Sequence, residues 1–250
     1  MYGQDYRLKM DKYGLIGKSL SHSFSKSFFE HFFTENQIQA SFHNFELNTI
    51  HDVEQVFEQN LKGCCVTIPY KEQIIPFLDQ LSDEANEIGA VNVIRFDGSK
   101  KIGHNSDAFG FQQSIKPFLT NKHERAIVLG TGGASKAVTY VLRKIGIDVI
   151  FVSRNPLSDK EFSYADVNEN MIGACKLIVN CTPLGTFPNV NDKIELPYQF
   201  LGDEHLVVDL IYNPEKTPFL KAAELEGATI LNGSSMLKHQ AFKAWEIWNK

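Results

Sequence analysis

A glycine-rich turn between two apolar segments holds the residue types that most directly suggest chemistry. Residues 126–129 are apolar, residues 130–135 are Gly-Thr-Gly-Gly-Ala-Ser, and an amphipathic run to Ile145 precedes the apolar residues 148–152. This order is typical of a strand, a turn, a helix and a second strand. The turn would let backbone N–H groups at the helix N-terminus approach a pyrophosphate. We therefore expect a dinucleotide to contact Gly130, Thr131, Gly132, Gly133 and Ala134, with Ser135 replacing a third glycine.

The residues after the second strand bear on which dinucleotide binds. An NAD site places an acidic residue about 20 positions after the glycines, where it binds the ribose 2′-hydroxyl. Here the second strand ends in Ser153-Arg154-Asn155. A guanidinium suits a 2′-phosphate, which an acid would repel. The pattern favours NADP over NAD, although a glycine-rich turn can also join a strand to a helix for steric reasons alone.

Polar residues in the first half of the chain could bind a small hydroxylated acid and exchange its proton. Ser23 and Ser25 begin an expected helix, where hydroxyls and free N–H groups can hold a carboxylate or simply cap the helix. Lys71 lies in the first turn of another expected helix, where the positive helix end disfavours an ammonium; it could act in chemistry or bend into solvent. Asp107 could orient Lys71 or cap a helix. Asn92, at a strand end, could bond a substrate hydroxyl.

The elements that must position these residues alternate along the chain. Strands are expected at residues 13–17, 41–47, 63–67, 90–96, 100–103, 126–129, 148–152, 177–180, 206–209 and 228–231. Helices are expected at 23–37, 49–59, 107–119 and 234–248, after Pro69, and between the glycine turn and Ile145. Such alternation indicates an α/β fold with largely parallel sheets, and the glycine turn begins a Rossmann unit. Residues 1–107 would then form a separate N-terminal lobe, and a cleft between two such lobes is a natural binding site.

Composition limits the classes of function. The 250 residues, with 43% hydrophobic and 22% charged residues, are ordinary for a globular protein of one large or two smaller domains. A formal charge of −5 argues against a general nucleic-acid or anionic membrane surface. We see no apolar run of membrane-spanning length and no signal peptide. The four cysteines and scattered histidines show no metal-ligand spacing, so we expect no metal and a reducing, cytoplasmic location. Met1 and Met10 both remain possible starts.

Taken together, these residues resemble the shikimate dehydrogenase family from about residue 13 to the C-terminus. The segments that carry the resemblance, in the family's order, are SHSFS at 21–25, VTIPYK at 66–71, GAVN at 89–92, NSD at 105–107, GTGGAS at 130–135, NCTPLG at 180–185, DLIY at 209–212 and MLKHQ at 236–240. Any one of them is modest support. Eight segments in the family's order favour the family over the purely structural interpretations given above, which are a steric glycine turn, helix caps and a solvent-exposed lysine.

The resemblance implies reversible reduction of 3-dehydroshikimate to shikimate with NADPH, on the route to chorismate and the aromatic amino acids. Lys71 and Asp107 resemble the family's catalytic pair, with Lys71 the proton donor and acceptor. By the same motifs, the substrate contacts are Ser23, Ser25, Thr67, Asn92, Tyr212 and Gln240, and the cofactor contacts include Ser153, Arg154 and Thr182. The implied fold is a substrate-binding domain at 1–107, an NADP-binding Rossmann domain at 108–232, and a C-terminal helix at 233–250 that packs on the substrate domain.

Departures from the family pattern keep alternatives open. Family members often carry a second basic residue after the arginine, but Ser158 stands here and Lys160 is the nearest cation, so the preference for NADP could be weaker than usual. A quinate/shikimate dehydrogenase paralogue is the second hypothesis, because quinate differs by a C1 hydroxyl near Ser23, Ser25 and Tyr212. A non-catalytic protein that senses NADP or a metabolite is the third. We expect a monomer or homodimer whose partner is a small-molecule substrate.

Overall fold

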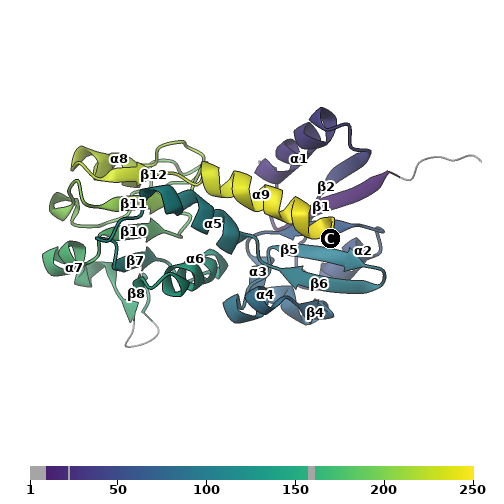
Figure 1. Cartoon of the computed structure of the whole chain (residues 1–250), viewed down its shortest axis with the longest axis horizontal. Coiled ribbons are helices and arrows are strands. Elements are labelled where there is room, and N and C mark those ends of the chain that lie inside the picture. Colours follow the sequence, from purple (N-terminus) through teal and green to yellow (C-terminus); the bar gives the residue numbers. More distant parts are fainter. Residues whose placement is uncertain (1–9, 22, 157–160) are drawn as a thin grey trace, which may run out of the picture. The chain divides into compact units, whose positions relative to one another are not determined.

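Two α/β units make up the part of the chain described by the structure, a computed structural model that covers residues 10–21, 23–156 and 161–250 (Figure 1). The first unit takes in the described residues up to Asn86, together with Ala90–Asn105 and Ala244–Lys250. The second unit takes in Glu87–Gly89 and the described part of Ser106–Lys243.

The first unit is built on a mixed sheet with the strand order β2-β1-β3-β5-β6-β4. These strands are β1 (Asp11–Gly17), β2 (Ala40–Glu46), β3 (Gly63–Val66), β4 (Gln80–Leu81), β5 (Val93–Asp97) and β6 (Lys100–His104). The expected parallel pairing holds for β1 with β2 and with β3. In contrast, β5 pairs antiparallel with β3 and β6. A short turn through Gly98, whose φ is +62°, joins β5 to β6, and so short a connection can join only antiparallel strands.

Short helices connect these strands. They are α1 (Phe24–Glu35), α2 (Val53–Phe57), α3 (Tyr70–Gln73) and α4 (Asp83–Ile88), with 3₁₀ turns at Ile50–Asp52 and Ile75–Phe77. The predicted helix at 49–59 thus begins as a 3₁₀ turn, where Thr49 and Asp52 form a capping box. Pro69 directly precedes α3, which is a single turn long. Helix α4 and strand β4 were not predicted, because elements this short leave no periodic pattern in the sequence.

An aromatic cluster fills the space between α1, the sheet and the last turn of the chain. In the predicted apolar stripe of α1, Phe29 and Phe33 are buried, whereas Phe28 and Phe32 are half-buried. The Phe29 ring centroid lies 5.0 Å from that of Trp248, and Tyr13 lies 4.9 Å from Trp248. Such packing stabilises the unit beyond the burial of apolar area alone.

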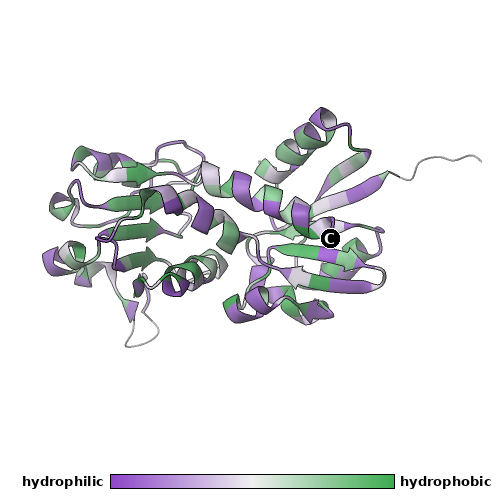
Figure 2. Cartoon of the chain, viewed as in Figure 1, coloured by the Kyte–Doolittle hydropathy of each residue, from purple (hydrophilic) through white to green (hydrophobic). Residues whose placement is uncertain are grey.

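The second unit is built on a fully parallel sheet with the strand order β12-β11-β10-β7-β8-β9. The strands are β7 (Arg125–Leu129), β8 (Asp148–Val152), β9 (Glu161–Phe162), β10 (Leu177–Asn180), β11 (Leu206–Asp209) and β12 (Thr229–Leu231). The order outward from β7 is that of a Rossmann fold, which confirms this part of the prediction. Strands β7, β10 and β11 are strongly hydrophobic (Figure 2), as expected for strands with both faces covered.

The helices of the second unit are α5 (Asp107–Ile115), α6 (Gly133–Lys144), α7 (Glu169–Ala174) and α8 (Pro218–Leu225), together with the first part of α9 (Ser234–Trp248). Helix α9 contributes to both units. In the second unit it lies so close to α5 that a Cβ on Gly110 would be 2.7 Å from the Met236 carbonyl oxygen. Its last residues, from Ala244 onward, belong to the first unit, where Ala244, Ile247 and Trp248 are buried. Among the described residues, no helix combines the length and apolar character needed to cross a membrane.

We expect Trp248 to be essential to the stability of the first unit. Its indole Nε1 donates to the Ile94 carbonyl oxygen at 3.0 Å, and a Cβ on Gly63 would overlap the ring. Trp248→Ala should lower the free energy of unfolding by about 3–5 kcal/mol through the cavity it leaves. Trp248→Phe keeps most of the ring and should cost about 1–3 kcal/mol through the lost hydrogen bond.

Urea unfolding followed by far-UV circular dichroism measures these differences. Leu225→Ala is the control, because Leu225 is 86% exposed and should change stability by less than about 0.5 kcal/mol. A Trp248→Ala protein as stable as the control would contradict the assignment.

Candidate active site and cofactor site

The glycine turn lies where a parallel α/β sheet binds phosphate, between the carboxyl end of β7 and the N-terminus of α6. Gly130 has φ +94°, a conformation that favours glycine. Gly132 is the N-cap of α6, and neither a capping side chain nor an acidic residue occupies the first turn. A Cβ on Gly132 would meet no atom within 4 Å. The positive end of a 12-residue helix is therefore left open to an anion.

Ser135 is buried in the first turn of α6, directly after the glycine turn. Its side chain is 1% exposed, and its hydroxyl donates to the Gly132 carbonyl oxygen at 2.6 Å. The small side chain lets α6 pack closely on the sheet, as the sequence predicts for the position of a third glycine.

The loop after β10 lies against the glycine turn. Strand β10 pairs with β7 in the middle of the sheet, where the strand order reverses, and ligands of such sheets bind beyond the strand ends at this switch point. A Cβ on Gly130 would lie 2.9 Å from Cγ2 of Thr182. Thr182 and the glycine turn, both predicted cofactor contacts, are thus neighbours. We call the loops after β7 and β10 the switch-point loops.

The predicted residues for the 2′-phosphate follow β8. Ser153 is buried, and its hydroxyl donates to Glu161 Oε2 at 3.4 Å. Arg154 is exposed, and it lies close enough to Tyr164 for its charge to lower the pKa of that phenol, which burial raises. Ser158 and Lys160 lie outside the described residues.

A buried polar network behind the switch-point loops centres on Asp209, the last residue of β11. Its Oδ1 accepts from Asn180 Nδ2 at 2.9 Å and from the Ile211 N–H at 3.0 Å, and its Oδ2 accepts from the Thr217 hydroxyl at 2.6 Å. Asn180 Oδ1 in turn accepts from the N–H and the hydroxyl of Thr182, at 2.9 and 2.7 Å. Burial raises the pKa of the Asp209 carboxyl to about 6, although these hydrogen bonds lower it.

Sequence reasoning quoted Asn180 and Asp209 as parts of motifs but assigned neither a role. A signal was present, since each polar residue ends a short and otherwise continuous apolar strand. A polar side chain in that position must find partners inside the protein.

In the first unit, three predicted residues lie at one edge of the sheet. Thr67 follows β3, and Asn92 precedes the antiparallel β5, so the two share that edge; the Val66 N–H donates to the Asn92 carbonyl oxygen at 2.8 Å. The Lys71 carbonyl oxygen accepts from the Val91 N–H, also at 2.8 Å. Backbone hydrogen bonds therefore hold the half-buried Lys71 and Thr67 near the buried Asn92.

The loop that leads to Ser23 is fixed beside Thr67. A Cβ on Gly17 would be 2.6 Å from a Leu20 side-chain carbon and 2.7 Å from Thr67 Cγ2. The Leu20 N–H donates to Glu46 Oε1 at 2.6 Å, and the Leu20 carbonyl oxygen accepts from Asn44 Nδ2 at 3.1 Å. Both partners belong to β2, so these two contacts, which sequence reasoning missed, tie the loop to that strand.

The two predicted serines begin α1, as expected. Ser23 is its N-cap and accepts from the Lys26 N–H at 3.4 Å, so the capping role weighed above is present in the structure. Ser25 lies in the first turn and is half-buried.

The remaining predicted residues belong to the second unit. Asp107 is the first residue of α5 and is 2% exposed, and Ser106 rather than Asp107 occupies the N-cap. Tyr212 lies in the loop after β11, and Gln240 lies on α9 next to Gly110 of α5. Both are half-buried. Lys71 and Asp107 are therefore carried by different units.

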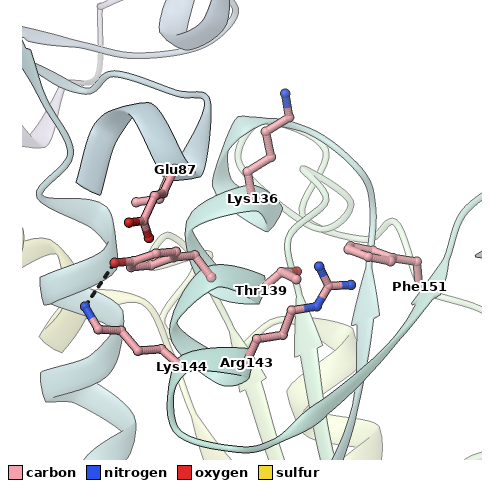
Figure 3. A pocket seen from close by; sticks show the side chains of 8 residues that line it. Glu87, Lys136, Thr139, Arg143, Lys144 and Phe151 are labelled. Atoms are coloured by element: carbon pink, nitrogen blue, oxygen red, sulfur yellow. Dashed lines mark hydrogen bonds between the residues drawn. The ribbon is translucent and has the colours of Figure 1, made fainter. Parts of the chain in front are cut away.

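A pocket of about 720 Å³ lies over another face of α6, within the second unit (Figure 3). It is lined by Glu87, Ile88, Lys136, Thr139, Tyr140, Arg143, Lys144 and Phe151. Lys144 Nζ donates to the Tyr140 hydroxyl at 2.9 Å. None of the predicted catalytic, substrate or cofactor residues lines this pocket, so we do not assign it to the active site.

Comparison with known proteins places the chain in a family. Residues 15–94 match the family model described as the shikimate dehydrogenase substrate binding domain. A shikimate dehydrogenase (NADP(+)) of Aquifex aeolicus is 38% identical, over 95% of this chain and 90% of its own length. The chain belongs to the shikimate dehydrogenase family. The resemblance seen in the sequence is thereby confirmed.

Solved structures of relatives share the fold. Shikimate 5-dehydrogenase of Thermus thermophilus, solved with NADP(H) and shikimate, superposes with a TM-score of 0.84 at 28% identity, over 96% of this chain and 93% of that one. A quinate dehydrogenase of Corynebacterium glutamicum, solved with NAD, also gives 0.84, at 26% identity over 95% and 93%.

The residues at the switch point fit NADP. The open and uncapped helix end suits a pyrophosphate, and the exposed guanidinium of Arg154 follows the second strand, where the adenosine ribose of a dinucleotide lies in Rossmann folds. Thr182 is held against the glycine turn by partners that keep its hydroxyl turned toward Asn180. Together with the family membership, this arrangement agrees with NADP as cofactor.

The raised pKa of Asp209 leads to a pH-dependent stability. Because the folded-state pKa is about 6 rather than 3.8, the folded chain binds this proton more tightly than the unfolded chain does. The stabilisation that the protonated Asp209 contributes is therefore fully present below about pH 4. It is lost as the pH rises through about 6, which lowers the free energy of unfolding by about 3 kcal/mol. Asp209→Asn stays neutral, so its free energy of unfolding should increase relative to the wild type by that amount between pH 4 and pH 7.5.

Urea unfolding at a series of pH values measures this difference. Leu225→Ala, at an exposed position of the same unit that carries no ionisable group, is the control whose difference from the wild type should not change with pH. A constant difference for Asp209→Asn would show that Asp209 is not the group described.

Proposed function

We propose that this chain catalyses the reversible, NADP-dependent reduction of 3-dehydroshikimate to shikimate, a step toward chorismate and the aromatic amino acids. The observation that carries the proposal is the 38% identity to an NADP-dependent shikimate dehydrogenase over nearly the whole of both chains. The bound cofactor supplies or accepts the hydride.

Lys71 and Asp107 are proposed as the catalytic residues. Lys71 donates a proton to the substrate oxygen during reduction and removes it during oxidation, and Asp107 orients the ammonium group. General acid–base help of this kind contributes about 10²–10⁴ in rate. The backbone of Lys71 is tied to the strand edge that carries Asn92, since its carbonyl oxygen accepts from the Val91 N–H, and this defined backbone position supports the assignment.

Substrate contacts are proposed for both units. Ser23 and Ser25, at the N-terminus of α1, hold the carboxylate together with Tyr212, because a helix N-terminus and hydroxyl groups favour an anion. Thr67, Asn92 and Gln240 bond the ring hydroxyls. The loop before Ser23, which is tied to β2, supports this assignment, since it holds the serines in place before substrate binds.

Cofactor contacts are proposed for the switch-point loops and for the residues after β8. Gly130, Thr131, Gly132, Gly133 and Ala134 hold the pyrophosphate, and Thr182 lies opposite them. Ser153 and Arg154 take the 2′-phosphate. The proposed domains are a substrate-binding domain at 1–107, an NADP-binding domain at 108–232 and a C-terminal helix at 233–250 that packs on the substrate domain. A cytoplasmic location and a monomer or homodimer are likewise proposed from the sequence.

Replacing Lys71 should separate catalysis from cofactor binding. Lys71→Ala should lower turnover of shikimate with NADP by about 10²–10⁴ while the dissociation constant for NADP stays within about twofold. Nicotinamide absorbance and calorimetry measure the two quantities. Lys221→Ala, at an exposed position on α8, is the control. Near-normal turnover in Lys71→Ala would remove Lys71 from the chemistry.

The same assay with quinate separates the main proposal from its alternative. The wild type should oxidise shikimate far more efficiently than quinate. This expectation rests on the relative from Aquifex aeolicus, a shikimate dehydrogenase that is 38% identical over nearly its whole length. Equal efficiency on quinate would favour the quinate/shikimate paralogue. Binding of NADP without turnover of either acid would favour a sensor.

Replacing Arg154 tests the choice of cofactor. Arg154→Ala should weaken NADP binding by about 10–100-fold, the effect of losing a charged hydrogen bond to the 2′-phosphate, and should change NAD binding less than about twofold. Arg143→Ala, which removes an exposed arginine from α6, serves as the control. Equal losses for NADP and NAD would contradict a role at the 2′-phosphate.

A further inference from the structure

We propose that Asp209 is a positioning residue for the cofactor, acting through Asn180 to hold Thr182 against the glycine turn. The inference deepens the proposed function and rests on NADP binding at the switch-point loops. Neither Asp209 nor Asn180 is among the residues assigned above to substrate or cofactor.

The direction of each hydrogen bond fixes the side chains of the network. A backbone N–H can only donate, so the N–H of Thr182 requires the oxygen of the Asn180 amide, and the Asn180 NH₂ must then face Asp209. The Ile211 N–H requires an acceptor at the same carboxylate oxygen. Only an acceptor at Asp209 Oδ1 satisfies both donors, and this orientation leaves the Asn180 oxygen for Thr182.

The same bonds determine which side of Thr182 faces the glycine turn. Its hydroxyl donates to Asn180 at 2.7 Å, which turns the methyl group toward Gly130. Thr182 therefore offers the cofactor apolar surface rather than a hydrogen-bond donor. The 2.9 Å clearance for a Cβ on Gly130 shows how closely the two loops approach, so a small shift of Thr182 would change the shape of the phosphate-binding turn.

Asp209 also holds the loop that carries Tyr212. Its carboxylate accepts from the N–H of Ile211, the residue before Tyr212, and from the Thr217 hydroxyl, where that loop ends and α8 begins. One fully buried carboxylate thus fixes the loops after two adjacent strands. A buried charge of this kind reduces stability compared with a neutral side chain, so its presence at a strand end agrees with a role in positioning.

Two variants at Asp209 separate positioning from charge. Asp209→Asn retains an acceptor oxygen for Asn180 and Ile211, whereas Asp209→Ala removes it. Below the unfolding temperature of each variant, we expect Asp209→Ala to raise the dissociation constant for NADP at least tenfold. Asp209→Asn should stay within about threefold of the wild type. Isothermal titration calorimetry without shikimate gives both values, so the outcome does not depend on turnover.

A third variant keeps the proposal testable if Asp209→Ala does not fold. Asn180→Asp has the same shape, and when it is protonated its carboxyl can still donate to Asp209 and accept from Thr182. Loss of that proton places two carboxylates together and breaks the link. Asn180→Asp should therefore bind NADP like the wild type at pH 6.5 and at least tenfold more weakly than the wild type at pH 9, both measured with folded protein.

The proposal is overturned if folded Asp209→Ala binds NADP within twofold of the wild type, or if Asp209→Asn is as weak as Asp209→Ala. It is also overturned if Asn180→Asp follows the wild type at both pH values. Normal NADP binding by a wild type that does not turn over shikimate would overturn the proposed function and leave this inference standing. A wild type that binds no NADP overturns both.

Discussion

Strands β7 and β10 lie side by side in the second sheet, although they are separated in the chain by β8, β9 and the helices between them. Neighbouring loops at such a reversal of strand order turn to opposite sides of the sheet and leave the strand ends accessible. In this chain both exits carry small or polar residues, Gly130 on one side and Thr182 on the other. The helix that follows Gly130 begins without a capping side chain, so the topology and the missing cap together leave the proposed pyrophosphate site open to an anion.

The loops after β10 and β11 are held by two polar side chains, Asn180 and Asp209, that are buried at the ends of apolar strands. Val207 and Val208, next to Asp209 in β11, are buried on both faces of the sheet, yet the strand ends in a carboxylate that is 0% exposed. Three donors compensate the lost hydration of that carboxylate without restoring its ordinary pKa. The buried carboxylate thus reduces the stability of the second unit at a place where two loops are held relative to each other. In the first unit, the loop that contains Leu20 is held by an exposed carboxylate instead: the Leu20 N–H donates to Glu46.

Local patterns in the sequence were sufficient for most of the elements and for the cofactor turn, because glycine, proline and alternating apolar residues act over a few positions. The 15-residue α9 was predicted to its ends, whereas α4, α7, β4 and β9 are too short for a periodic pattern; α8 was missed although Thr217 and Pro218 mark its start. The antiparallel pairing of β5 with β3 was missed because these strands are far apart in the sequence, whereas its pairing with β6 follows from the short turn at Gly98. The network around Asp209 was missed for the same reason, since Asn180 is 29 positions away. Contacts such as Leu20 with Glu46 become visible only after the strands are placed in register.

At the proposed 2′-phosphate site, Arg154 is the cation among the described residues that directly follow β8. Ser153 follows β8 directly, and its hydroxyl donates to the carboxylate of Glu161 at 3.4 Å, so it must exchange that partner to bond a phosphate. The favourable charge therefore comes from Arg154, which is exposed and screened by water and salt. A planar guanidinium can bind a phosphate through two parallel charged hydrogen bonds, which is how we propose that Arg154 distinguishes NADP from NAD.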